Sequence, residues 1–164
     1  MPNIYATQLQ ESADWRSARL GQSAGAEHLG VSLYELSPGQ GMVFHYHVQR
    51  EELLIVVAGA LALRTAEGWR DLPEGEVVAF PRGPSGAHGY ENRTEDTVRL
   101  LMMSEQNAPN ISVYPDRNEV GMFDEADPEN RRLGALFKVT DAVSDYGGGK
   151  AEIVAPQPGP RPAT

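Results

Sequence analysis

The chain has 164 residues, carries a formal net charge of -9 and contains no cysteine. This length suits one domain with a hydrophobic core of its own. The lack of cysteine excludes thiol nucleophiles, cysteine-ligated zinc and iron–sulfur clusters. The only lysines are Lys138 and Lys150 and the arginines are scattered, so no clustered basic face predicts binding to nucleic acid. The excess of acidic residues is best explained by solubility.

The first residues, MPNIYATQLQESADWR, contain neither a basic segment nor an apolar one, so they do not predict a signal peptide. No apolar run approaches the roughly 20 residues of a membrane-spanning helix. We therefore expect a soluble cytoplasmic protein that does not bind a membrane. The secondary structure of the first 25 residues is left open by their pattern.

Residues 31–104 consist of strand-length segments separated by turn residues. The segments VSLYEL, MVFHYHV, ELLIVV and TVRLLMMS are typical strands, and glycine or proline follows most of them. Short strands at this spacing are typical of an all-β sandwich or barrel. Since the pattern occurs once, the sequence predicts one barrel per chain.

The segments outside this core give weaker signals. Asp127 as N-cap and Pro128 as the first helical residue predict a short helix within DPENRRLGALF. The final APQPGPRPAT is proline-rich with little to bury, which favours a disordered tail. We therefore expect an N-terminal extension (1–25), a barrel core (26–106), a C-terminal extension packing on the barrel (107–148) and a disordered tail (149–164).

Three of the four histidines form a pattern that predicts a metal site. Side chains two apart on a strand point the same way about 7 Å apart, so His45 and His47 can reach one ion. Glu52 lies on the next strand, and His88 begins a later one. Three imidazoles and a carboxylate suit a divalent transition metal such as Fe, Mn, Ni, Co or Zn. The alternative for the histidine pair is a polar strand face in solvent, and His28 fits only a surface role.

These residues fall on two motifs of a known family. The segment PGQGMVFHYHVQREELLIVVAG resembles the first cupin motif, with the motif positions on Gly39, His45, His47, Glu52 and Gly59. The segment GEVVAFPRGPSGAHGYEN resembles the second cupin motif, with the positions on Gly75, Pro81, Gly83, His88 and Asn92.

One departure from the general pattern narrows the resemblance. Four residues, PSGA, separate Gly83 from His88 where most cupins have two. A subgroup of small bacterial cupins has the same insertion, and the chain resembles it over residues 15–148. Some members of that subgroup are labelled sugar-phosphate-isomerase-like. The resemblance implies a double-stranded β-helix (jelly-roll) barrel, a homodimer and a metal bound by His45, His47, Glu52 and His88, but no particular reaction.

Neighbouring residues offer alternatives for the site. Glu51 is the rival of Glu52, but strand alternation sends it to the opposite face. Tyr90 shares a face with His88 and is a candidate catalytic proton donor, or else a core aromatic. Arg82 could bind an anionic substrate at the entrance of the site, although an arginine in such a loop is more often simply exposed to solvent. Other predicted interior residues are Met102 and Met103, and Val43, Leu54 and Val56 as the lining of an apolar cavity.

The ligand set would leave two adjacent positions for a small oxygenated substrate on an octahedral metal. We therefore expect a metal-dependent enzyme, either a dioxygenase or an isomerase or lyase of the Lewis-acid type, with Tyr90 or a partly detached Glu52 moving the proton. A sugar-phosphate isomerase is an alternative, but it needs cations for the phosphate. Those would be Arg50, Arg64, Arg82, Arg93 or Arg99. A non-catalytic module that binds a small ligand is the other alternative.

Overall fold

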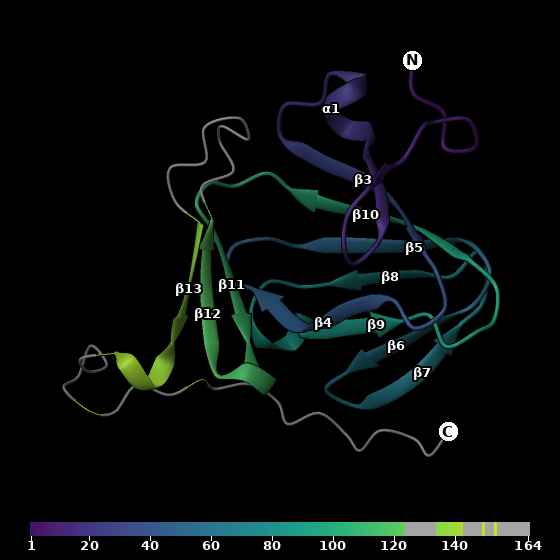
Figure 1. Ribbon diagram of the computed structural model, residues 1–164. Coiled ribbons are helices and arrows are strands. Elements are labelled where there is room, and N and C mark those ends of the chain that lie inside the picture. The colour runs from purple at the N-terminus through teal and green to yellow at the C-terminus, as the bar shows by residue number, and fades with distance from the viewer. Residues whose placement is uncertain (124–133, 143–148, 150–152, 154–164) are drawn as a thin grey trace.

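The structure is a computed structural model, and it describes residues 1–123, 134–142, 149 and 153 (Figure 1). Two antiparallel sheets dominate these residues. The first sheet has the spatial order β1 (Gln10–Glu11), β2 (Arg16–Arg19), β3 (Leu29–Leu36), β10 (Val98–Glu105), β5 (Glu52–Ala58) and β8 (Val77–Phe80). The second has the order β13 (Gly134–Lys138), β12 (Glu119–Phe123), β11 (Asn110–Tyr114), β4 (Gly41–His47), β9 (His88–Glu91), β6 (Leu61–Thr65) and β7 (Gly68–Leu72).

The helical elements are short. They are α1 (Leu20–Ala24) and the 3₁₀ turns Pro84–Gly86, Pro115–Arg117 and Val139–Asp141. No helix in the described part of the chain is long and apolar enough to span a membrane. The prediction of an all-β jelly-roll barrel is therefore confirmed.

An apolar core fills the barrel because inward side chains alternate with outward ones along its strands. The buried members of this core are Leu36, Leu54, Val56, Leu61, Leu63, Leu72, Phe80, Tyr90, Val98, Leu100 and Met102. Leu54 and Val56 are thus packed together in the interior. Met103 lies on the other face of β10 and is only half-buried.

A β-bulge in β4 corrects one prediction. Met42 pairs with Tyr90 and His45 pairs with His88, so the register shifts by one residue between them. The extra residue reverses the alternation: Met42 packs on the core, whereas Val43 is 39% exposed. The prediction that Val43 lines the interior is therefore wrong. Gly89 lies opposite the bulge, where a Cβ atom would come within 3.0 Å of the backbone of β4.

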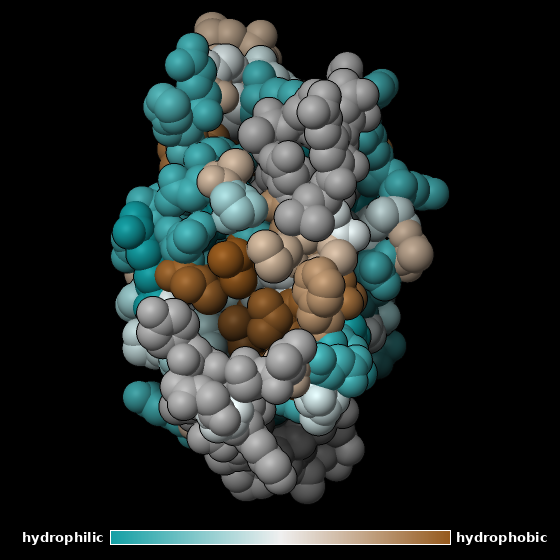
Figure 2. Space-filling model, turned by 90° about the vertical axis from the view of Figure 1, so that its left-hand side faces the viewer, coloured by the Kyte–Doolittle hydropathy of each residue, from teal (hydrophilic) through white to brown (hydrophobic). Residues whose placement is uncertain are grey.

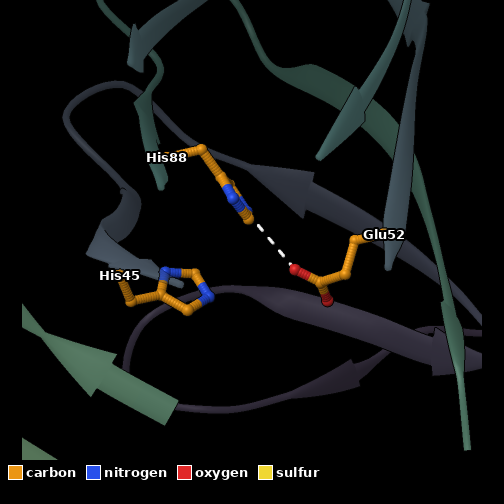
Figure 3. A group of neighbouring side chains, drawn as sticks. All are labelled: His45, Glu52 and His88. Carbon is orange, nitrogen blue, oxygen red and sulfur yellow. Dashed lines mark ion pairs between the residues drawn. The ribbon is translucent and has the colours of Figure 1, made fainter. Parts of the chain in front are cut away.

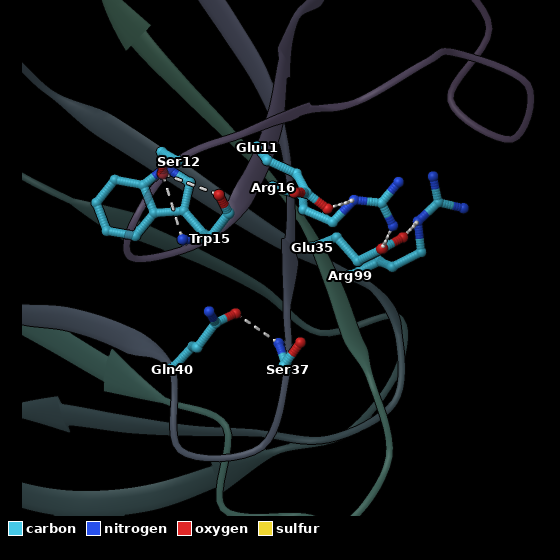
Figure 4. Close-up of polar contacts among 8 residues, drawn as sticks. All are labelled: Glu11, Ser12, Trp15, Arg16, Glu35, Ser37, Gln40 and Arg99. Carbon is cyan, nitrogen blue, oxygen red and sulfur yellow. Dashed lines mark hydrogen bonds and ion pairs between the residues drawn. The ribbon is translucent and has the colours of Figure 1, made fainter.

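The N-terminal segment extends the first sheet, since β2 pairs with β3. Trp15 packs edge-on against Tyr34, with ring centroids 5.7 Å apart. Glu35 of β3 forms ion pairs with Arg16 of β2 and with Arg99 of β10, and Figure 4 shows the carboxylate between the two guanidinium groups. This charge network joins three neighbouring strands.

The segment after the barrel forms the β11–β13 meander, which Figure 1 shows at one side of the molecule. Strand β11 pairs with β4, with Ser112 opposite His47. The predicted helix start at Asp127 and Pro128 lies outside the described residues. Downstream of it, Gly134–Lys138 pairs with β12 as a strand. Of the predicted disordered tail, the structure describes only residues 149 and 153.

Candidate metal centre

Three of the predicted ligands come together between the two sheets (Figure 3). His45 is on β4, His88 is the first residue of β9, and Glu52 is the first residue of β5 in the opposite sheet. Their candidate ligand atoms all lie within 4.8 Å of one another. His45 and His88 are direct partners in the β4–β9 pairing, so one strand pair fixes both imidazoles.

These three side chains are buried. Their exposed fractions are 7% for His45, 9% for Glu52 and 1% for His88. A polar strand face in solvent, the alternative considered for His45 and His47, therefore does not describe His45. Glu51 is exposed, as strand alternation predicts.

Backbone carbonyl groups orient two of the imidazoles. Nδ1 of His45 lies 2.9 Å from the carbonyl oxygen of Val43, and Nδ1 of His88 lies 2.9 Å from that of Gly86. A carbonyl group only accepts hydrogen bonds, so Nδ1 must carry the proton in both rings. Each Nε2 then has a free lone pair, as a metal ligand requires.

Burial sets the charge of these groups. It lowers the pKa of His45 to about 3, aided by the charges of His88 and His47, and it also lowers the pKa of His88. For Glu52, burial would raise the pKa, but interaction with His47 and the charges of His88 and His45 outweigh it and lower the pKa. Near neutral pH the site therefore combines the neutral imidazoles of His45 and His88 with the ionised carboxylate of Glu52.

The arrangement lacks a positive charge at its centre. Oε2 of Glu52 lies 3.4 Å from Nε2 of His88, and both atoms are buried without a hydrogen-bond partner among the described residues. Two lone-pair donors at this distance repel each other, and an unpaired buried carboxylate is costly. A divalent cation would satisfy both atoms, so the residues present fit a bound metal.

The fourth predicted ligand, His47, borders this group. Its Nε2 lies 3.2 Å from Oε2 of Glu52, and its ring centroid is 5.0 Å from that of His45. It falls outside the set of atoms within 4.8 Å of one another. Its Nδ1 faces two side chains of β11, Asn110 Oδ1 at 2.9 Å and Ser112 Oγ at 3.1 Å.

Two aromatic rings enclose the histidines. Phe80 stacks on His88 with centroids 3.7 Å apart, and Tyr114 stacks on His45 at 5.9 Å. Sequence patterns do not predict these contacts, because Phe80 and Tyr114 reach the histidines only through strand pairing. They place apolar surface beside the ligands and limit the freedom of the rings.

Tyr90 lies in the apolar core, one inward position along β9 from His88. Burial, Tyr34 and the charge of Glu52 raise the pKa of Tyr90 well above 10, so the phenol is neutral. It can donate a proton but does not serve as a phenolate base at neutral pH.

Three other residues named in the sequence analysis, Arg82, His28 and Asn92, do not belong to the ligand group. Arg82 is exposed and pairs with Glu105. His28 is exposed. Asn92 is fully buried, and its amide donates hydrogen bonds to the carbonyl groups of Leu36 and Asp96, so it ties two loops together.

Two hollows on the described surface lie away from these ligands. One, of about 910 Å³, lies on the face of β4 that points away from the ligands, where Tyr46, Val113, Leu136 and Phe137 are among its lining residues. Figure 2 shows apolar side chains gathered in a hollow on the side of the molecule that carries β11–β13. The other, of about 340 Å³, is lined in part by Arg64 and Trp69. Neither includes His45, Glu52 or His88.

The comparisons with known proteins agree with this architecture. The cupin domain family model matches residues 32–104. Comparison with curated proteins gives no match. A solved sugar phosphate isomerase of the cupin superfamily from Silicibacter pomeroyi is 28% identical over 76% of each chain, with a TM-score of 0.69.

Two further solved structures share the fold. A proposed sugar phosphate isomerase from Acidithiobacillus ferrooxidans is 22% identical over 78% of each chain, with a TM-score of 0.68. The polyketide cyclase RemF from Streptomyces resistomycificus is 19% identical over 67% of this chain and 82% of its own, with a TM-score of 0.57. Residues 32–104 thus match the cupin domain family, and the two-sheet barrel resembles that of the cupin-superfamily protein from Silicibacter pomeroyi.

Proposed function

We propose that the protein is a metal-dependent cupin enzyme that acts on a small oxygenated molecule, with His45, His47, Glu52 and His88 as the metal ligands. The observation that carries this proposal is the convergence of buried lone pairs on Glu52. The Nε2 atoms of His45 and His88 point their lone pairs inward because their Nδ1 protons are committed to carbonyl groups. A site that only stabilised the fold would place a hydrogen-bond donor opposite the carboxylate.

The chain's own residues would hold and enclose the substrate. A divalent metal in this ligand set would polarise a substrate oxygen as a Lewis acid or, as iron, support oxygen chemistry. Phe80 and Tyr114 would exclude water from the histidine side of the site. Tyr90, a neutral phenol in the same interior, is the candidate proton donor.

The charged side chains favour a substrate without a phosphate group. Each of the five arginines that could bind a phosphate already contacts a protein oxygen atom. Their partners are Asn107 for Arg50, Asp116 for Arg64, Glu105 for Arg82, Glu91 for Arg93, and Glu35 and Ile4 for Arg99. A phosphorylated substrate would have to displace one of these partners.

A sugar-phosphate isomerase remains the second candidate, because the protein from Silicibacter pomeroyi with that description is 28% identical over 76% of each chain. A non-catalytic small-ligand module is the third, and it predicts ligand binding without turnover. Turnover assays with dicarbonyls, enols, catechols and sugar phosphates, with and without metal, discriminate among the three.

The homodimer stays a proposal as well. Leu136 and Phe137 of the edge strand β13 are both about half exposed, at 52% and 50%, and exposed apolar side chains favour association. Light scattering on the purified protein measures the mass directly.

The decisive experiment is elemental analysis of the purified parent, His88→Ala and His28→Ala, each measured again after incubation with Mn, Fe, Co, Ni and Zn and removal of free ion. His28 is exposed and outside the site, so His28→Ala controls for metal bound nonspecifically by surface histidines. We expect close to one metal per chain in the parent and in His28→Ala, and none in His88→Ala. Equal metal content in all three would refute the site.

A further inference from the structure

We infer that Asn110 and Ser112 are positioning residues for His47, which they orient from outside the matched cupin domain. This inference rests on the proposed metal site. Both residues lie on β11 (Asn110–Tyr114), beyond the family match that ends at residue 104.

His47 is held differently from the other two histidines. The Nδ1 protons of His45 and His88 go to backbone carbonyl groups two residues earlier in the chain, so the local backbone orients these rings. Nδ1 of His47 instead faces Asn110 Oδ1 at 2.9 Å and Ser112 Oγ at 3.1 Å, 63 and 65 residues later in the sequence. The orientation of His47 therefore depends on two side chains that substitution can remove.

Strand pairing explains why both side chains reach the ring. Ser112 is the direct partner of His47 across the β4–β11 pair, and Asn110 lies two residues away on the same face of β11. Asn110 is 5% and Ser112 is 1% exposed. Buried polar groups are costly unless they are hydrogen-bonded, so the contacts with His47 hold the three side chains in one arrangement.

The contact also determines which ring nitrogen faces the site. When Asn110 Oδ1 accepts the Nδ1 proton, Nε2 is left with a free lone pair 3.2 Å from Oε2 of Glu52. A carbonyl oxygen of a neutral amide fixes this tautomer without adding charge. An aspartate at this position would fix the same tautomer, and its negative charge would make Nε2 of the imidazole a stronger metal ligand.

The test uses Asn110→Ala, Asn110→Asp and Ser112→Ala, with Asn107→Ala as the matched control. Asn107 is exposed on the same segment and its amide donates to the carbonyl of Gln49, not to a histidine. Circular dichroism and thermal unfolding establish that each variant folds. Co²⁺ serves as the probe, with its affinity measured by chelator competition and its geometry by visible absorption.

We expect Asn110→Ala to weaken Co²⁺ binding by about 10- to 100-fold, the usual effect of removing a hydrogen-bond partner from a metal-ligating histidine. Asn110→Asp should restore the affinity, Ser112→Ala should have a smaller effect, and Asn107→Ala should bind like the parent. Unchanged affinity and cobalt spectrum in Asn110→Ala would overturn the inference.

A second measurement does not need the metal. Nitrogen NMR of ¹⁵N-histidine-labelled, metal-free protein reports which ring nitrogen of His47 carries the proton. We expect the Nδ1–H form in the parent and in Asn110→Asp, and a mixture of forms in Asn110→Ala. If neither the parent nor any variant binds Co²⁺ but the tautomers of His47 differ as expected, the proposed function fails and the positioning role stands. If the tautomer of His47 is the same in Asn110→Ala as in the parent, the positioning role fails.

Discussion

Nε2 of His88 lies 3.4 Å from Oε2 of Glu52 across the gap between the two sheets, and both atoms are acceptors. Because the Nδ1 proton of His88 is committed to Gly86, no proton is left to bridge the pair. The metal-free protein thus keeps a repulsive contact in its interior. Such local strain at a site is common where function requires it.

Glu52→Gln is expected to stabilise the metal-free protein and to weaken metal binding strongly. The amide of glutamine can donate a hydrogen bond to Nε2 of His88 or His47, which replaces repulsion by attraction and contributes about 1–2 kcal/mol. Metal affinity should fall by roughly two orders of magnitude or more, because the only carboxylate among the proposed ligands is lost. Thermal unfolding in EDTA and chelator competition measure the two effects.

The control is Glu51→Gln, which makes the same substitution at the exposed neighbouring residue. It should change neither the thermal stability without metal nor the metal affinity. A loss of stability in Glu52→Gln without metal would contradict the repulsive contact.

The metal-free protein should lose stability as the pH falls from about 6.5 towards 3. Burial lowers the pKa of His45 from 6.5 to about 3, so in this window the unfolded state binds a proton that the folded state does not. The contribution of His45 to the free energy of unfolding is therefore fully present above about pH 6.5. It declines below that pH with a slope of about 1.4 kcal/mol per pH unit for one proton. The lowered pKa of Glu52 acts in the same direction at the acidic end.

Urea unfolding in EDTA at several pH values measures this slope. His45→Gln should flatten it because the titrating group is removed, and His28→Gln, at an exposed position, should leave it unchanged. A slope that is equal in the parent and in His45→Gln would contradict the assignment.

Sequence reasoning could predict the barrel and the three converging ligands because both depend on local signals. Turn residues bound each strand, and side chains of one parity share a face. The motif spacing then assigns His45, Glu52 and His88 to three different strands of the barrel. Strand alternation and the resemblance to cupins also predict His47, whose place in the ligand set stays a prediction.

Long-range pairing is what the sequence could not reveal. Asn110 and Ser112 reach His47 because β11 joins β4, and no pattern in β11 specifies that partner. The strand at Gly134–Lys138 likewise forms by pairing with β12, which no local pattern in the sequence predicts. Element identity there follows from neighbours distant in sequence.

The bulge in β4 predicts unequal effects for two residues that the sequence placed together. Leu54 is fully buried, so Leu54→Ala should destabilise the protein by about 2–5 kcal/mol. Val43 is 39% exposed, so Val43→Ala should change the free energy of unfolding by less than about 0.5 kcal/mol. Urea unfolding compares them, and equal losses would mean that the bulge does not turn Val43 outwards.

Tyr90→Phe is expected to leave metal affinity unchanged and to lower turnover. The phenol is not a ligand, and the raised pKa of Tyr90 keeps it neutral, so it acts as a donor. Removing a positioned proton donor lowers kcat by about 10²- to 10⁴-fold. Tyr46→Phe is the matched control, because Tyr46 is buried in the cluster on the opposite face of β4. A variant that turns over as fast as the parent would assign Tyr90 to core packing and leave Glu52 as the remaining candidate for proton transfer.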